Sequence, residues 1–410
     1  MSKNIKTGID NIYLGLFLHY LAWTIPIVLS KEIEIVTAIL CSIGWVYIIK
    51  GFNKYKGHRR LQFSGLYRFL FVAYLIVTLV MIIRGYTIDY EYQWISFKGM
   101  INFTFFNTTY ILPYIMPLIV FIPFKETNLS IIVKFSVVAS ILMIICAVLQ
   151  HKTIIASSLN SESGGQSING IYAPFTFVTL LYLYIRPKKW YYNVIAFTFM
   201  FVIAIISARR GSSAIYASLF IIGLYNWSNN IKSNILRFFS KFVAIAIVIY
   251  GINIFSTSSL TSFIRNRGLE DNRSHVDEAL LSQMNEYELV FGKGLNGRYY
   301  FPLLENDYQN GWRYGTETGF YNIVLKGGYL MAILHIIVLL YPALLGIFKS
   351  RNNLCKMLGA YIIISLLELY PFGHLTFNFK FLIIWTGVLL CYKQTVREMT
   401  DKQIKQLLFK

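Results

Sequence analysis

Acidic residues are scarce in this chain, and their scarcity limits the kinds of protein that it can be. Only 19 aspartates and glutamates stand against 38 lysines and arginines in 410 residues, and just 14% of all residues are charged. With 56% hydrophobic residues and a mean hydropathy of +0.54, the chain has too little polar surface to cover a water-soluble globule of this size. The composition therefore predicts a polytopic membrane protein.

Cysteine is also sparse, and the common cofactor motifs are missing. Cys41, Cys146, Cys355 and Cys391 are scattered over apolar segments and short loops, which indicates neither a disulfide framework nor a cysteine metal site. The sequence contains no P-loop, no GxGxxG motif after a strand and no HExxH motif, so we expect no cofactor and no metal. The positive charge lies mostly in short loops between apolar runs, which sets membrane topology and does not indicate a nucleic-acid partner.

Apolar runs long enough to cross a ~30 Å hydrocarbon core occur about twelve times. The expected spans cover 11–29, 33–49, 66–83, 103–123, 131–149, 169–185, 191–207, 211–226, 240–256, 317–347, 354–370 and 376–392. With a cytoplasmic N-terminus, 24 of the 38 lysines and arginines fall on the cytoplasmic side, where positive loops usually lie. An even number of crossings then places both termini in the cytoplasm. The first run lacks a clear cleavage site, so we expect a retained helix.

One long polar stretch, from Thr257 to Thr316, interrupts this pattern. It holds 8 of the 19 acidic residues and 6 basic ones. The chain thus divides into spans one to nine (1–256), an outer loop with short helices (257–316), and spans ten to twelve with a cytoplasmic tail (317–410). Every cytoplasmic loop is short, which leaves no room for a domain that uses cytosolic nucleotides. Within the outer loop, the pattern over 276–289 predicts an amphipathic helix.

Two arginines end the seventh run on the outer side, against the charge bias of the other loops. Arg209 and Arg210 precede Gly211, and guanidinium groups bind phosphate through two parallel charge-assisted hydrogen bonds. The start of the next helix would also favour an anion. Arginines that merely extend to the level of the lipid head groups would give the same pattern.

Further candidates lie in the polar stretch. Arg265 and Arg273 can contact a second phosphate, although arginines in solvated loops are often only surface charges. His275 has the intrinsic pKa of a general base, although a single loop histidine is often inert. The glycine-rich turn Gly292-Lys293-Gly294 can present backbone N–H groups to a ligand, as many tight loops can.

Glu317 is a carboxylate at the point where the chain re-enters the membrane from the polar stretch. One interpretation is a general base that removes a proton from an attacking hydroxyl. The other is an acid in the first turn of the tenth helix, where it stabilises the helix N-terminus. Glu368 and His374, which flank a short outer turn, are further candidates for the same region.

These features resemble the bacterial O-antigen polymerase and O-antigen ligase superfamily of membrane glycosyltransferases. The resemblance lies in the number of spans, the arginine pair, the large outer loop with Arg273 and the Gly-x-Gly turn, and Glu317 followed by Thr318, Tyr321 and Gly328. It covers 200–345 in detail. It implies an all-α, GT-C-like protein of the bacterial inner membrane with a large periplasmic loop between helices 9 and 10. It also implies periplasmic transfer of glycans from undecaprenyl diphosphate without nucleotide sugars.

The resemblance also implies roles for particular residues. The expected catalytic residues are Glu317, Arg210 and Arg273, and the expected substrate-binding residues are Arg209, Arg265, His275, Arg298 and Tyr314. The expected partners are lipid-linked oligosaccharide donor and acceptor, the lipid bilayer, and a chain-length regulator. Ligases usually carry a histidine at the position of Glu317, which favours a polymerase. A ligase that acts on lipid A core, a flippase for lipid-linked oligosaccharide, and a non-catalytic scaffold are the alternatives.

Overall fold

The chain folds into helices over most of its described length. The computed structural model describes residues 3–29, 34–54, 61–88, 101–122, 129–149, 151, 173–206, 210–229, 231, 233–238, 242, 272–302, 311–370 and 373–408. The chain divides into two compact units. The first unit comprises 1–5, 52–124 and 271–399, and the second comprises 6–51, 125–270 and 400–410.

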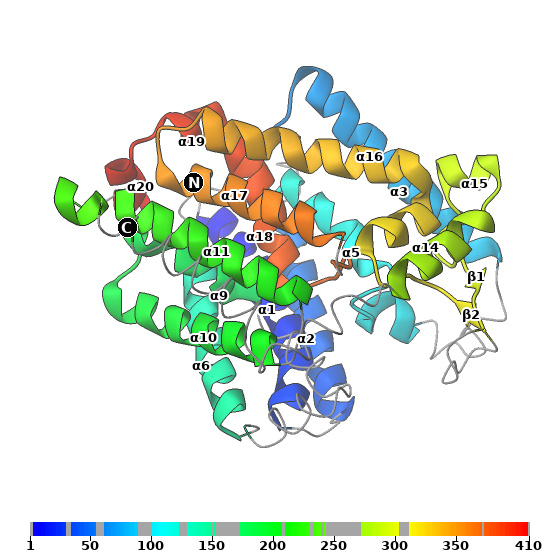
Figure 1. The fold of residues 1–410 in the computed structure, drawn as a ribbon, viewed down its shortest axis with the longest axis horizontal. Helices are drawn as coiled ribbons and strands as arrows, with labels where there is room; N and C mark the ends of the chain where they lie inside the picture. The colour runs from blue at the N-terminus through cyan, green and yellow to red at the C-terminus, as the bar shows by residue number, and fades with distance from the viewer. Residues whose placement is uncertain are drawn as a thin grey trace. The chain divides into compact units, whose positions relative to one another are not determined.

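The first unit is built around one long helix, α16 (Gly319–Phe348). Its other helices are α3 (Gly65–Ile88), the π-helical turn η1 (Asn102–Phe106), α5 (Leu112–Ile115), the 3₁₀ helix η2 (Met116–Phe121), α14 (Asn272–Ser282), α15 (Glu286–Phe291), α17 (Asn353–Glu368), α18 (Phe379–Tyr392) and α19 (Gln394–Glu398). Strands β1 (Tyr299–Tyr300) and β2 (Trp312–Arg313) pair antiparallel, with Tyr299 opposite Arg313. Helix α16 packs against α3, α15, α17 and α18 (Figure 1).

Helix α18 forms the centre of the first unit. Nearly all its residues are apolar and buried, as expected for a helix that other elements cover on every side. Trp385 packs there against the rings of Tyr74 and Phe71 from α3. The hydroxyl of Tyr74 lies 3.1 Å from Nδ1 of His335 on α16, so these two buried polar groups satisfy each other.

The second unit contains α1 (Lys3–Leu29), α2 (Glu34–Asn53), α6 (Leu129–Leu149), α9 (Ala173–Val178), the 3₁₀ helix η5 (Thr179–Tyr184), α10 (Pro187–Ile206), α11 (Arg210–Asn229) and α20 (Asp401–Leu408). Helices α1 and α2 approach closely at Gly15 and Gly44, which have no side chains to keep the two backbones apart. A side chain at Gly15 would overlap the backbone of Gly44. Helices α6 and α10 share a buried polar contact, in which Ser140 Oγ donates to Asn193 Oδ1 at 3.1 Å. Polar side chains on apolar helices thus find partners on neighbouring helices.

Four helices in the described ranges are long and apolar enough to cross a membrane: Glu34–Asn53, Gly65–Gly85, Leu129–Leu149 and Gly319–Phe348. Large apolar side chains on α3 are exposed, among them Leu66 at 73% and Phe69 at 68%, as expected for a surface that contacts lipid. The prediction of an all-α, membrane-spanning protein is therefore confirmed. The number of twelve spans, the GT-C-like arrangement and the orientation stay predictions.

Two of the expected spans differ from continuous helices. The run over 103–123 forms η1, α5 and η2 in succession, and Pro113 and Pro117 interrupt the backbone hydrogen bonds that one long helix would need. The run over 169–185 forms α9 and η5, with non-helical backbone at Leu181 (φ −96°, ψ 27°). The expected span 240–256 lies outside the described residues, apart from residue 242.

Candidate functional site

The start of α16 is held by hydrogen bonds to the polar segment that precedes it. Thr318 is the N-cap residue, with extended backbone, and its hydroxyl donates to Asp277 Oδ1 of α14 at 2.6 Å. The hydroxyl of Thr316 donates to the carbonyl of Thr318 at 2.6 Å. These bonds fix the position at which the chain enters the membrane-spanning helix.

The turn between α17 and α18 packs against the same helix start. The N–H of Phe320 donates to the carbonyl of Leu369 at 3.0 Å. A side chain at Gly319 would overlap the carbonyl of Gly373, so glycine is required for this close approach. Asn322 Nδ2 lies 3.2 Å from Nδ1 of His374. Donation by the amide places the imidazole proton on Nε2.

Lys326 follows Asn322 by one helical turn and is 7% exposed. Its ammonium forms no hydrogen bond or ion pair with any residue that the structure describes. Within the same described part of the chain, Asn322 Oδ1 is also buried without a hydrogen-bond partner. Burying a charge or an amide oxygen without a partner costs free energy, so two such groups one turn apart mark this place as a candidate site.

Neighbouring charges change the pKa of His374. Burial lowers the pKa of His374 below its ordinary value of 6.5, the positive charge of Lys326 lowers it further, and Glu317 raises it. The lowered pKa leaves the imidazole neutral at pH 7, and a neutral imidazole can accept a proton at one nitrogen. Glu317 and Lys326 therefore both act on His374 at the entry to α16.

Glu317 is exposed and precedes the first residue of α16 by two positions. Helix α16 has no acidic residue in its first turn, so the interpretation of Glu317 as a first-turn acid is wrong. The prediction that Glu317 acts as a base is not tested by its position, but its carboxylate lies at the surface, where a substrate can reach it.

Two of the expected substrate-binding residues lie together on the β-hairpin. The Arg298 guanidinium lies 3.5 Å from the Tyr314 hydroxyl and stacks over the Trp312 ring, 4.5 Å from its centroid. Trp312 also makes an edge-to-face contact with Tyr300 across the two strands. The hairpin therefore presents a cation among aromatic rings.

The other expected site residues are placed less completely. Arg273 lies in the first turn of α14, and Arg210 begins α11 of the second unit; their side chains are outside the described part of the structure. Arg209 and Arg265 lie wholly outside the described residues. His275 is exposed, and its Nδ1 lies 4.0 Å from Glu278 Oε2, a pair that is ionic only when the imidazole is protonated.

The glycine-rich turn after α15 uses its N–H groups within the protein. The N–H of Lys293 donates to the carbonyl of Leu325 at 2.8 Å, and that of Gly294 donates to Lys326 at 2.9 Å. A break in α16 at Gly328, where φ is 71° and ψ is 179°, removes the N–H partners that these two carbonyls would have within a continuous helix. The prediction that this turn presents Lys293 and Gly294 N–H groups to a ligand is therefore wrong. The turn completes the backbone hydrogen bonds of the broken helix.

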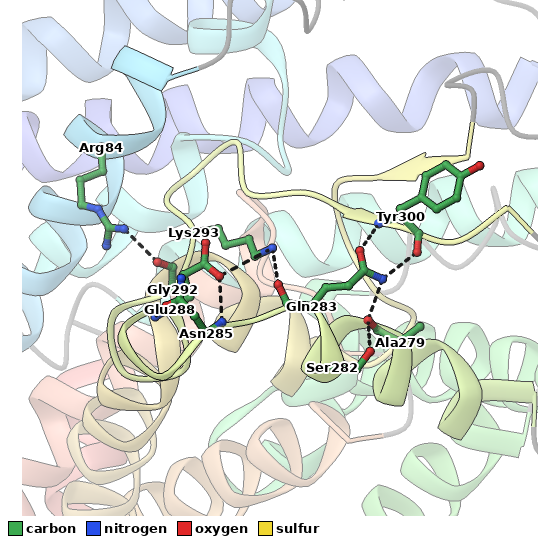
Figure 2. A network of polar contacts seen from close by, with 9 residues as sticks. All are labelled: Arg84, Ala279, Ser282, Gln283, Asn285, Glu288, Gly292, Lys293 and Tyr300. Carbon is green, nitrogen blue, oxygen red and sulfur yellow. Dashed lines mark hydrogen bonds and ion pairs between the residues drawn. The ribbon is translucent and has the colours of Figure 1, made fainter.

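Further contacts hold this turn in place (Figure 2). Arg84, near the end of α3, donates to the carbonyls of Phe291 and Gly292 at 2.9 and 3.0 Å. Lys293 Nζ donates to the carbonyl of Gln283 at 2.9 Å and lies 3.8 Å from Glu288 Oε2. The backbone of Lys326 is thus supported through a chain of hydrogen bonds that begins on α3.

The expected amphipathic helix over 276–289 is two helices. Helix α14 ends at Ser282, and α15 begins after Asn285, whose side chain accepts from the N–H of Glu288 at 2.9 Å while Glu288 accepts from the N–H of Asn285. This capping box starts a new helix. The Gln283 side chain, between the two helices, joins this segment to β1, because it bonds to both the N–H and the carbonyl of Tyr300 at 2.8 Å (Figure 2).

Sequence reasoning passed over Lys326 and Asn322. A lysine within an apolar run was the available signal, since ionisable residues inside membrane helices are rare and usually functional.

Among the described residues, no group of three or more His, Cys, Asp or Glu side chains could hold a metal ion. Comparisons with family models, curated proteins and solved structures give no match to this chain.

Proposed function

We propose that this chain is a glycan polymerase of the bacterial inner membrane. It moves a growing glycan from undecaprenyl diphosphate to a hydroxyl of another lipid-linked repeat unit on the periplasmic side. The observation that carries the proposal is the exposed carboxylate of Glu317, close enough to interact with the partly buried imidazole of His374 where a membrane-spanning helix begins. The Glu317 carboxylate can accept a proton at the membrane surface, where a lipid-linked substrate meets water.

In this mechanism the acceptor hydroxyl oxygen attacks the anomeric carbon of the donor sugar. The bond from that carbon to the diphosphate oxygen breaks, and the diphosphate leaves with the electron pair of this bond. Glu317 takes the proton of the hydroxyl, and the imidazole of His374 interacts electrostatically with the Glu317 carboxylate. The reaction needs no nucleotide, which agrees with the short cytoplasmic loops that the sequence predicts.

Positive charge near the departing diphosphate lowers the barrier because it stabilises the charge that develops there. Within the first unit, the residue assigned to this role is Arg273. Removing one such group typically lowers the rate by roughly 10²- to 10³-fold. The aromatic hairpin supports sugar binding, since Trp312 and Tyr300 are 37% and 46% exposed and offer rings with polar edges.

A ligase that transfers finished glycan to lipid A core is the second candidate. Members of the resembling superfamily with that activity usually carry a histidine where this chain has Glu317. His374, from the turn between α17 and α18, supplies an imidazole that interacts with Glu317. This electrostatic interaction is the specific observation that favours a ligase.

The experiment is a gel of surface glycolipids from a deletion strain, complemented with wild type, Glu317→Gln or His374→Asn. Lipid A core that carries a single repeat unit in the deletion identifies a polymerase. Bare core with accumulated lipid-linked polymer identifies a ligase, and repeat units trapped on the cytoplasmic side identify a flippase. Unchanged glycolipids in the deletion reject all three.

The point variants test the mechanism. Because a positioned general base contributes about 10²- to 10⁴-fold, Glu317→Gln should abolish the glycan ladder at normal protein levels. Glu286→Gln is the matched control, because Glu286 is also an exposed acid of this outer segment, in α15, and should leave the ladder intact. A normal ladder from Glu317→Gln would remove Glu317 from the mechanism.

A further inference from the structure

We infer that Lys326 and Asn322 form a binding site for a head group that carries both a phosphate and a neighbouring hydroxyl. Under the proposed function, on which this assignment of the ligand rests, the head group is the phosphorylated sugar of the lipid-linked donor. Neither residue is among those that the sequence pattern assigns to the site.

The ammonium of Lys326 requires an anion. It has three hydrogen-bond donors and no acceptor, and the side chain is 7% exposed. No described residue pairs with it. Its neighbour His374 has a lowered pKa and supplies no negative charge. A buried cation of this kind is costly without a partner, so a ligand anion is the group that completes the site.

The amide oxygen of Asn322 requires a donor. Its amide nitrogen is directed to His374 Nδ1, and Oδ1 is left buried with no hydrogen-bond partner in the described part of the chain. The ionised phosphate of an ester has only acceptors and cannot satisfy this oxygen. A hydroxyl on the same ligand can, and phosphorylated sugars and glycerol phosphates carry one close to the phosphate.

The spacing of the two residues suits one small head group. Positions four apart on a helix have Cβ atoms about 5–6 Å from each other on the same face. The carbonyl of Lys326 is held by the N–H of Gly294 at 2.9 Å, and a side chain at Gly292 would overlap the same carbonyl. The glycine-rich turn therefore fixes the backbone from which Lys326 extends, which reduces the entropy lost when a ligand binds.

Two sources can supply this chemistry: the lipid-linked donor and a phospholipid such as phosphatidylglycerol. The test uses the purified full-length protein in phosphatidylcholine nanodiscs. Its thermal unfolding midpoint is measured alone, with an undecaprenyl-diphosphate monosaccharide, and in nanodiscs that contain phosphatidylglycerol. The variants are Lys326→Met and Asn322→Leu. Lys349→Met, at the exposed far end of the same helix, is the matched control.

The wild type should be stabilised by the sugar diphosphate, and Lys326→Met should weaken this binding by at least about tenfold. Without ligand, Lys326→Met should unfold at the same or a higher temperature than the wild type, because it removes an unpaired buried charge. Asn322→Leu should lower affinity for the sugar diphosphate more than for inorganic diphosphate, which lacks the sugar hydroxyl. Lys349→Met should bind like the wild type.

Stabilisation by phosphatidylglycerol that Lys326→Met abolishes would support the site and assign it to a lipid head group. Absence of any ligand effect on the wild type, an undiminished effect on Lys326→Met, or a lower unfolding temperature of this variant without ligand would overturn the inference. A deletion strain with normal glycolipids would reject the polymerase and leave a Lys326-dependent binding site standing. A full glycan ladder from Lys326→Met, with a defective deletion strain, would leave the polymerase standing and reject Lys326 as part of its donor site.

Discussion

Two lysines of the first unit are equally buried and have opposite surroundings. Lys326 in α16 is 7% exposed and Lys380 in α18 is 6% exposed. Lys380 forms an ion pair with Glu368 at the end of α17, and its ammonium also lies 5.5 Å from the centroid of the Phe381 ring. The Lys326 ammonium has no such partner among the described residues. Burial alone therefore does not distinguish a structural charge from a charge that binds a ligand. The presence or absence of an ion-pair partner within the protein distinguishes them.

The largest effect is expected from breaking the Lys380–Glu368 pair. Lys380→Met leaves the Glu368 carboxylate buried and unpaired, which should lower the free energy of unfolding by about 3–5 kcal/mol. The double variant Glu368→Leu/Lys380→Met removes both charges and should recover most of this loss. Denaturant unfolding in detergent measures all three proteins. If Lys380→Met were as stable as the wild type, the contrast with Lys326→Met would disappear.

A somewhat smaller loss is expected from Gly328→Ala, which tests the break that positions Lys326. The backbone at Gly328 (φ 71°, ψ 179°) lies in a region that is essentially open to glycine alone, at a cost of about 1–3 kcal/mol for other residues. A side chain there would also overlap the carbonyl of Val290. The free energy of unfolding should fall by at least this amount, and ligand binding through Lys326 should weaken.

Gly223→Ala is the control for this substitution. Among the described residues, a side chain at Gly223, in α11, would meet only Leu180 Cδ2, at 3.7 Å, so alanine should raise stability slightly through its higher helix propensity. Equal effects of the two glycine substitutions on ligand binding would show that the break in α16 does not position Lys326.

A smaller change is expected at the start of α15, which leads into the glycine-rich turn. Asn285→Ala removes the side chain that caps α15 and should lower the free energy of unfolding by about 1 kcal/mol. Asn285→Asp keeps an acceptor for the N–H of Glu288 and should be nearly neutral. Amide hydrogen exchange over 286–294 would locate the effect, since faster exchange confined to these residues is expected only in the alanine variant.

The long helices could be predicted from the sequence because length and apolarity are local properties. Spans 33–49, 66–83, 131–149 and 317–347 were expected, and helices cover all four. Prolines explain the clearest failure, since Pro113 and Pro117 break an apolar run that hydropathy alone treats as one helix. The polar stretch was correctly expected to hold short helices, but a capping box at Asn285 divides the one amphipathic pattern into two.

The candidate site was harder to predict because its residues come from distant parts of the chain. Asn322 and His374 are 52 positions apart, and only the close packing at Gly319 brings them together. The glycine-rich turn was misinterpreted for a related reason. Glycines that approach a ligand and glycines that approach a helix have the same sequence pattern, and only the contact with Leu325 and Lys326 shows which case applies.

The smallest effect is expected from the titration of His374, and it tests whether Lys326 carries a positive charge. Because the pKa of His374 is lowered in the folded protein, the unfolded chain takes up this proton first as the pH falls. The stability that the neutral imidazole contributes is therefore present above its ordinary pKa of 6.5 and is lost as the pH falls below that value. The wild type should lose more stability than His374→Asn between pH 7.5 and pH 5.5, in denaturant titrations of both proteins. In the Lys326→Met background this difference should shrink, since the cation that helps to lower the pKa is gone. An unchanged difference would mean that Lys326 does not lower the pKa of His374.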